Sequence, residues 1–263
     1  MRSKLAVQMY TLRDYLKTAD GLGESLERIS SMGYQAVQLS AVGAMDGESP
    51  AVSVKLARRM LDDNGLRCVA THRSWETLSQ ETEAEIAFHK ELDCDYVAIG
   101  GMPGPWGQQE AADFTRFLKE SAPVIARLKA AGIRFGYHNH DLEFRRTGQG
   151  RQTLLDIFID EGGPDFTLEI DTYWAIHAGA DPVDLINRCK GRIPVIHLKD
   201  KEVVKNEGPI MAAIGEGNLN WDSILPACKS AGVEWYAIEQ DTCPRDPFDC
   251  LRSSFEFLKE RDL

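Results

Sequence analysis

The sequence lacks long hydrophobic runs and closely spaced cysteines. No window holds 18 consecutive apolar residues, so no transmembrane helix is expected. The amino terminus shows no apolar segment of the kind found in signal peptides, which favours a cytoplasmic protein. The six cysteines form no Cys-x-x-Cys pair and are scattered over 263 residues, so a disulfide framework is not expected.

Basic residues are also in deficit. The chain has 30 Lys and Arg against 41 Asp and Glu, a formal net charge of −11. Nucleic-acid grooves and anionic membrane surfaces are bound through basic patches, so neither is expected as a partner. The remaining composition, with 43% hydrophobic residues, is typical of a folded globular protein of one large or two small domains.

Short apolar runs alternate with longer amphipathic segments along the whole chain. This alternation is typical of a parallel sheet whose strands are joined by helices. The expected strands are Leu5–Met9, Ala36–Leu39, Arg67–Thr71, Tyr96–Ile99, Arg134–His138, Phe166–Ile170, Pro194–Leu198 and Trp235–Ile238. The expected helices are Ser25–Met32, Val52–Asn64, Thr77–Glu91, Phe114–Ala131, Thr153–Glu161, Pro182–Arg188, Trp221–Ala231 and Pro247–Glu260.

Eight such units in 263 residues match the size of a (β/α)8 TIM barrel, which is about 250 residues. A doubly wound open sheet would require a Gly-x-Gly-x-x-Gly turn after the first strand, and Val7–Arg13 contains no glycine. No linker or low-complexity segment divides the chain. We therefore expect an α/β protein with a single TIM-barrel domain over residues 1–263.

Histidines gather where the expected strands end. His72 follows the third strand, His138 and His140 end the fifth, and His197 ends the seventh. Active sites of TIM barrels lie at the carboxyl ends of the strands, so this placement indicates a functional site. The other two histidines, His89 on an expected helix and His177 after the sixth strand, are expected to be structural.

Carboxylates end the same strands. Side chains alternate along a strand, so Asp171, His197 and Glu239 can point into the barrel together with His138. Taken singly, each residue could be a helix cap or a solvated side chain. Together they suggest a ring of mixed imidazole and carboxylate ligands, which suits Mn²⁺, Zn²⁺, Co²⁺ or Fe²⁺ better than Mg²⁺ or Ca²⁺.

Five segments of the chain resemble the sugar phosphate isomerase/epimerase family. That family has the xylose isomerase-like barrel, which it shares with endonuclease IV, ketose epimerases and inosose dehydratases. The segments are Gly136–Phe144, Leu168–Trp174, Arg192–Asp200, Ile214–Trp221 and Ile238–Asp241.

The resemblance implies one divalent metal ion, bound by a Glu, an Asp, a His and a Glu from strands five to eight. The last three match Asp171, His197 and Glu239 in this chain. The fifth strand has His138 where many relatives have Glu. We predict His138 as the fourth ligand, with His140 and Glu143 as alternatives.

The same resemblance implies an isomerase or epimerase that acts on a sugar or keto-sugar through a metal-stabilised enediolate. Glu239, His138, His140 and Lys199 are the predicted catalytic residues. A dehydratase or lyase of an inosose or 3-keto-sugar is the alternative, because an imidazolium can protonate a β-leaving group. A non-catalytic sugar-binding barrel is a second alternative, and a homo-oligomer is compatible with all three. The net charge disfavours a DNA-repair role.

Other residues near the strand ends are expected to contact the substrate or shape the mouth. Lys199 is expected to be either an electrophile or the partner of Asp171 or Asp200 in an ion pair. Gly215 and Gly217 are expected to allow positive φ, with Glu216 reaching the site. The predicted substrate contacts are His72, Glu143, Trp106, Trp174 and Gln8, with Tyr173 as a further aromatic surface.

Overall fold

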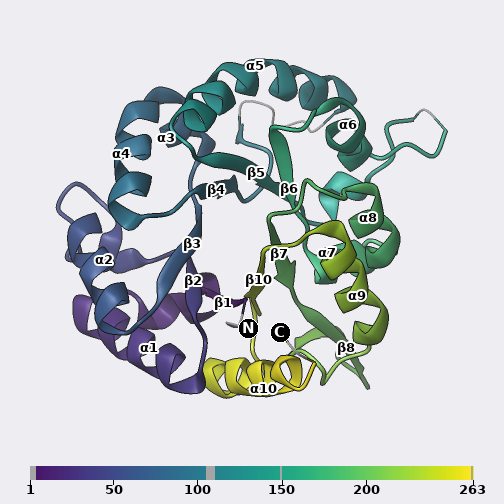
Figure 1. Ribbon diagram of the computed structural model, residues 1–263. Helices are drawn as coiled ribbons and strands as arrows, with labels where there is room; N and C mark the ends of the chain where they lie inside the picture. The colour runs from purple at the N-terminus through teal and green to yellow at the C-terminus, as the bar shows by residue number, and fades with distance from the viewer. Residues whose placement is uncertain (1–3, 105–109, 149, 262) are drawn as a thin grey trace.

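The computed structural model describes residues 4–104, 110–148, 150–261 and 263, so the predicted contact Trp106 lies outside the described residues (Figure 1). A ring of parallel strands is surrounded by helices, which confirms the predicted barrel. The barrel strands are β1 (Leu5–Gln8), β2 (Ala36–Leu39), β3 (Arg67–His72), β4 (Tyr96–Ile99), β5 (Arg134–His138), β6 (Phe166–Glu169), β7 (Val195–Leu198) and β10 (Trp235–Ile238).

The strands pair in the order β6-β5-β4-β3-β2-β1-β10-β7, and every pair in this sheet is parallel. Strands β6 and β7 close the ring with little regular pairing. They are joined by an isolated bridge between Asp171 and His197, where the His197 N–H donates to the carbonyl of Ile170 at 2.8 Å. The barrel therefore closes at two of the predicted metal ligands.

The helices cover the outside of the ring. Several of them start with a side-chain cap; for example, the Thr18 hydroxyl accepts from the Gly21 N–H at 3.1 Å, and the first helix ends at Gly33 with φ 107°. The α-helices are α1 (Ala19–Met32), α2 (Val54–Asp63), α3 (Trp75–Gln80), α4 (Thr82–Leu92), α5 (Ala111–Ala130), α6 (Leu154–Glu161), α7 (Thr172–His177), α8 (Pro182–Arg188), α9 (Trp221–Ala231) and α10 (Pro247–Lys259). Short 3-10 turns are η1 (Met9–Tyr15), η2 (Gly43–Met45) and η4 (Leu142–Phe144).

The structure differs from the expectation in three places. The expected helix Thr77–Glu91 is two helices, because Glu81 leaves the helical conformation between α3 and α4. An unpredicted helix, α7, follows β6, since the Asp171 side chain caps it by accepting from the Trp174 N–H at 2.9 Å. An unpredicted antiparallel hairpin follows β7, formed by β8 (Asp200–Val204) and β9 (Gly208–Ala212).

Asp200 anchors the chain that returns from this hairpin. Its buried carboxylate accepts from five donors, which are the N–H groups of Lys201, Gly215, Gly217 and Leu219 and the indole of Trp221. Gly215 has φ 92°, as predicted. The prediction of positive φ for Gly217 is wrong. This glycine is required because a Cβ would overlap the Asp200 carboxylate.

The side chain of Glu216, directly after Gly215, points away from the site. Glu216 pairs with Arg245 at 2.6 Å and accepts from the Ser253 hydroxyl at 2.5 Å, on the exposed side of α10. The expectation that Glu216 reaches the site is therefore wrong, because this surface arginine takes its carboxylate.

Two layers of packing stabilise the barrel. The outer layer packs the strands against the helices and contains side chains such as Val7, Ile99 and Phe166. Inside the ring most of the apolar side chains are small, with Tyr96 as a large exception, and Gly136 is required because a Cβ there would overlap the Tyr96 hydroxyl. Most of the apolar burial, and hence of the hydrophobic stabilisation, therefore lies outside the ring.

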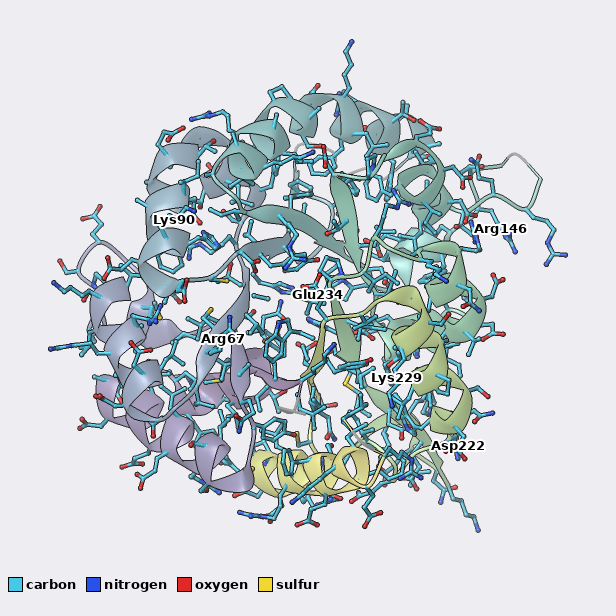
Figure 2. All side chains as sticks on the ribbon, viewed as in Figure 1. Arg67, Lys90, Arg146, Asp222, Lys229 and Glu234 are labelled. Atoms are coloured by element: carbon cyan, nitrogen blue, oxygen red, sulfur yellow. The ribbon has the colours of Figure 1, made fainter. Side chains whose placement is uncertain are left out.

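The amino-terminal end of the barrel carries partly exposed charges. Arg134 at the start of β5 pairs with Glu234 at 2.7 Å and with Asp95 at 3.2 Å. Figure 2 shows Glu234 near the centre of the ring, whereas Arg146 lies in a loop beyond the ring of helices. Among the described residues, none of the helices is both long and apolar enough to cross a membrane. All six cysteines are free thiols.

Candidate metal centre

The inward face of the barrel strands has a regular pattern: a small or uncharged residue is followed two positions later by a polar one. This pattern arises because successive side chains along a strand alternate between the outer and inner faces. The small layer includes Ala6, Ala36, Ala70, Gly136, Thr167, Val195 and Ala237. The polar layer above it consists of Gln8, Gln38, His72, His138, Glu169, His197 and Glu239.

The four predicted metal ligands lie together in this polar layer. One donor atom from each of His138, Asp171, His197 and Glu239 lies within 4.8 Å of the others. His138 Nε2 is 3.8 Å and His197 Nδ1 is 4.0 Å from Asp171 Oδ2, and His197 Nδ1 is 2.8 Å from Glu239 Oε2. All four side chains are at most 5% exposed.

The two alternative ligands from the fifth strand lie elsewhere. The Glu143 carboxylate accepts from the Tyr137 hydroxyl at 2.6 Å and from the His140 N–H at 2.8 Å, so it holds the loop after β5. The His140 ring lies on the outer side of His138, with their centroids 4.9 Å apart and the Trp174 ring 5.3 Å away. The geometry therefore favours His138 as the strand-five donor.

Lys199 extends into the same layer and is buried, with 2% exposure. Its ammonium lies 3.1 Å from Asp171 Oδ2, 2.7 Å from Glu239 Oε2 and 2.9 Å from Asp241 Oδ1. Burial alone would lower the pKa of Lys199, but these three carboxylates outweigh burial and raise it. Of the two partners expected for Lys199, Asp171 is correct and Asp200 is wrong, because Asp200 accepts from its own loop.

Glu169 and Gln38 were missed as site residues. Glu169 is fully buried beside three histidines: His72 Nε2 contacts its Oε2, and His197 Nε2 and His138 Nδ1 lie 3.1 Å and 3.5 Å from the same oxygen. Gln38 Nε2 donates to Glu169 Oε1 at 2.8 Å. The signal was present, since Glu169 shares a face with Asp171, and Gln38 stands two residues after Ala36.

The cluster separates the charges of its two central histidines. Burial alone would lower the pKa of His197, but Glu169 and Glu239 outweigh it and raise the pKa to about 10. Burial lowers the pKa of His138 well below its usual value, and His197 lowers it further. His138 is therefore a neutral imidazole, the form that binds metal ions.

The carboxylates of the cluster also differ. Burial raises the pKa of Glu239, but Lys199 and His197 outweigh burial and hold it well below the usual value. Burial raises the pKa of Asp171, and Lys199 and His197 offset this only in part. Glu239 is therefore ionised and available as a base.

Unpartnered polar atoms test whether the residues fit a cation. Asp171 Oδ2 and His138 Nδ1 are buried and have no hydrogen-bond partner. Buried polar atoms are nearly always paired, so such exceptions indicate an absent ligand or a functional role. Two imidazoles with two carboxylates form a donor set that transition-metal ions prefer. The residues fit a divalent cation.

The family model for xylose isomerase-like TIM barrels matches residues 26–261. The chain belongs to the xylose isomerase-like TIM barrel family. This confirms the fold and the family expected from the five segments.

Individual relatives are more distant. An inosose dehydratase of Bacillus cereus (strain AH820) is 26% identical over 150 residues, which are 49% of this chain and 48% of the relative. The chain thus spans about half the length of the curated relatives it matches. A sugar phosphate isomerase/epimerase structure from Parabacteroides distasonis ATCC 8503 has a TM-score of 0.81 at 23% identity, covering 98% of both chains. An L-ribulose 3-epimerase structure has a TM-score of 0.71 at 15% identity, covering 98% of this chain and 94% of that one.

The predicted substrate contacts of this xylose isomerase-like barrel that the structure describes differ in how far their polar atoms are engaged by other residues. Trp174 faces the Lys199 ammonium, which is 5.8 Å from the centre of its ring, and its buried indole nitrogen has no hydrogen-bond partner. His72 is engaged with Glu169, and the Gln8 side chain accepts from the Tyr10 N–H at 2.7 Å. The rings of Tyr173 and His177, both on α7, stack on each other with their centroids 5.4 Å apart. Among the described residues, Trp174 is therefore the predicted substrate contact least engaged in other polar bonds.

His89 shows what a structural histidine of the same barrel looks like. It is fully buried against β3, and its ring nitrogens contact the Thr71 hydroxyl and the Glu85 carbonyl, each at 2.7 Å. Both nitrogens are thus engaged, in contrast to His138.

Proposed function

We propose that this protein is a divalent-cation-dependent dehydratase or lyase, which removes the proton next to the carbonyl of an inosose or keto-sugar and eliminates a β-substituent. The observation that carries the proposal is the unequal chemistry of the site. The residues directly after β7 and β10 are Lys199 and Glu239, whereas the last residue of β5 and the loop after it bring only imidazoles to the site, His138 and His140.

The cation would be held by His138, Asp171, His197 and Glu239. When bound, it would polarise the substrate carbonyl and stabilise negative charge on the substrate oxygens. The remaining steps belong to side chains. Lys199 and His197 stabilise the charge of Glu239, so this side chain is ionised and carries no proton at neutral pH. In the proposed reaction it accepts the proton from the carbon next to the carbonyl.

The leaving group departs on the imidazole side. As the new carbon–carbon double bond forms, the β carbon–oxygen bond breaks, and His140 acts as the general acid that gives a proton to the departing oxygen. The products are water or an alcohol and an unsaturated ketone. Lys199 donates to the substrate oxygen, and Trp174 beside it forms an apolar wall.

A second candidate is the predicted isomerase or epimerase. It is favoured by the placement of an acid/base group on each side of the site, since His138 or His140 could return the proton to the opposite face of the substrate. The structural likeness to an L-ribulose 3-epimerase extends over almost the whole chain but supports the fold alone.

One experiment separates the two candidates. The protein is loaded with Mn²⁺ or Zn²⁺ and incubated in D₂O with a panel of inososes, 3-keto-glycosides and ketoses, followed by ¹H NMR. We expect loss of the β-substituent and a new vinylic signal. Deuterium incorporation next to the carbonyl without elimination would establish the epimerase instead.

The non-catalytic alternative is tested by metal analysis of the same sample. We expect about one equivalent of divalent metal per chain, removable with chelator, and recovery of turnover when the metal is restored. A protein that binds no divalent ion and has the same stability in chelator would contradict the metal centre.

A further inference from the structure

Beneath the proposed cation site lies a buried pair of polar side chains, Gln38 of β2 and Glu169 of β6. Both are fully buried and join strands on different sides of the barrel. Neither is among the four predicted ligands or takes part in the proposed chemistry. A buried carboxylate this costly to desolvate requires a reason for its presence.

Both carboxylate oxygens of Glu169 are already engaged: Gln38 Nε2 donates to Oε1 at 2.8 Å, His72 Nε2 contacts Oε2, and His197 Nε2 lies 3.1 Å from Oε2. A cation bound to Glu169 would have to displace these contacts. Donors about 2.1 Å from a tetrahedral ion stand about 3.4 Å apart. Around Asp171 Oδ2 the spacings to His138 Nε2 and His197 Nδ1 are 3.8 Å and 4.0 Å, which leave that room.

The hydrogen bonds determine which nitrogen of His197 carries a proton. An ionised carboxylate only accepts hydrogen bonds, so the amide of Gln38 must turn its NH₂ toward Glu169 Oε1, at 2.8 Å. Gln38 Oε1 then faces His197 Nε2 at 2.8 Å and can only accept from it. His197 therefore carries hydrogen on Nε2, and a cation bound at Nδ1 would take the place of the proton that Nδ1 shares with Glu239 Oε2 at 2.8 Å.

The same carboxylate orients His138. Its Nδ1 faces Glu169 Oε2 at 3.5 Å, whereas its Nε2 faces Asp171 Oδ2 at 3.8 Å. Each of the two histidines thus turns one nitrogen down to Glu169 and the other up to the cation site. A hydrogen bond to the second nitrogen is what orients metal-binding histidines in general. His197 Nε2 has such a bond with Gln38, whereas His138 Nδ1 faces Glu169 without one.

We propose that Glu169 and Gln38 are positioning residues that place the ring protons on His197 Nε2 and His138 Nδ1, so that His197 Nδ1 and His138 Nε2 bind the cation. This inference rests on the metal centre of the proposed function. It adds a requirement that the four ligands alone do not contain: the Gln38 amide must have one orientation, which the charge of Glu169 selects.

The test uses Zn²⁺ affinity, measured by chelator competition, together with ¹⁵N NMR of the histidine rings in the Zn²⁺-loaded protein. In Glu169→Gln the new carboxamide can donate to Gln38, so the Gln38 amide is free to turn its NH₂ toward His197. We expect Zn²⁺ to bind about 10–100-fold more weakly at unchanged stoichiometry, with the His197 proton no longer confined to Nε2.

The double variant Gln38→Glu with Glu169→Gln restores one carboxylate and one carboxamide, and with them the original arrangement of hydrogen-bond donors and acceptors around His197. The carboxylate then stands on β2, accepts from the carboxamide on β6 and accepts from His197 Nε2. We expect the double variant to recover most of the lost Zn²⁺ affinity and the wild-type His197 ring signals. The single variant Gln38→Glu should be the least stable protein, because two carboxylates then face each other.

The control is Glu85→Gln, which removes a buried carboxylate that binds Arg73 and belongs neither to the four predicted ligands nor to the cluster of Glu169 with His72, His138 and His197. It should change Zn²⁺ affinity by no more than about twofold. Unchanged affinity and ring signals in Glu169→Gln, or a folded double variant without recovery, would overturn the positioning role alone. A wild-type protein that binds no Zn²⁺ would overturn the proposed metal centre as well.

Discussion

Two buried aspartates at the ends of neighbouring strands, Asp200 and Asp171, have opposite surroundings. Both are fully shielded from solvent. The Asp200 carboxylate accepts from four main-chain N–H groups and an indole. Asp171 Oδ1 caps α7, but its Oδ2 has no hydrogen-bond partner, although the Lys199 ammonium lies 3.1 Å away.

The different surroundings indicate a structural role for Asp200 and a ligand role for Asp171. A carboxylate saturated by donors of its own chain holds that chain in one conformation, and nothing else can bind to it without breaking those bonds. Asp171 Oδ2 accepts no hydrogen bond and lies next to a neutral imidazole, with the Lys199 ammonium as its ion-pair partner, so this oxygen can bind a cation. Neighbouring positions of one barrel thus carry the same residue type for two purposes.

The largest effect is expected on turnover. Glu239→Gln keeps the size of the side chain but removes the base, so kcat should fall by about 10²–10⁴-fold in the NMR assay of elimination. The far-UV circular dichroism should be unchanged, because the barrel core does not depend on this side chain. Activity near the wild-type value would remove Glu239 from the role of base.

The second effect is on stability and concerns Asp200. Asp200→Ala leaves several buried N–H groups without an acceptor, so the free energy of unfolding should drop by at least about 3 kcal/mol in urea denaturation. Asp171→Asn should cost less than about 1 kcal/mol, since Asn caps helices as well as Asp does. Equal losses in the two variants would break the distinction drawn between these aspartates.

The third effect is stabilisation by the cation. At a Zn²⁺ concentration 100 times the dissociation constant, the wild type should gain about 2.7 kcal/mol of unfolding free energy. Asp171→Asn should show little of this gain, and chelator should abolish it in the wild type. A variant that is stabilised as much as the wild type would place the cation away from Asp171.

The smallest effect concerns the glycine that lets the chain approach Asp200. In Gly217→Ala the new methyl group overlaps the carboxylate and lies 2.6 Å from the Lys201 carbonyl, so about 1–3 kcal/mol of stability should be lost. Gly23→Ala inside α1 meets only Met60 Cε, at 3.5 Å, and should gain about 0.5–1 kcal/mol. Loss in both variants would mean that Asp200 is not the cause.

Much of this arrangement could be predicted from local pattern. The apolar runs marked the eight barrel strands, and the polar residues at their ends indicated His138, Asp171, His197 and Glu239 as one cluster. The break at Glu81 and the hairpin from Asp200 were missed. The chain that returns from the hairpin depends on hydrogen bonds whose partners no local periodicity reveals, such as Asp200 with the Trp221 indole.

The sequence by itself determined the alternation that turns a polar residue inward above a small one on most of the barrel strands, because side chains along a strand alternate with a period of two. Only the tertiary structure decided which of these polar residues meet. Gln38 and His197 are 159 positions apart, and the closure of the ring brings them to 2.8 Å. The tertiary structure also decided the different roles of Asp171 and Asp200. The number of donors around a buried carboxylate depends on which parts of the chain fold back next to it.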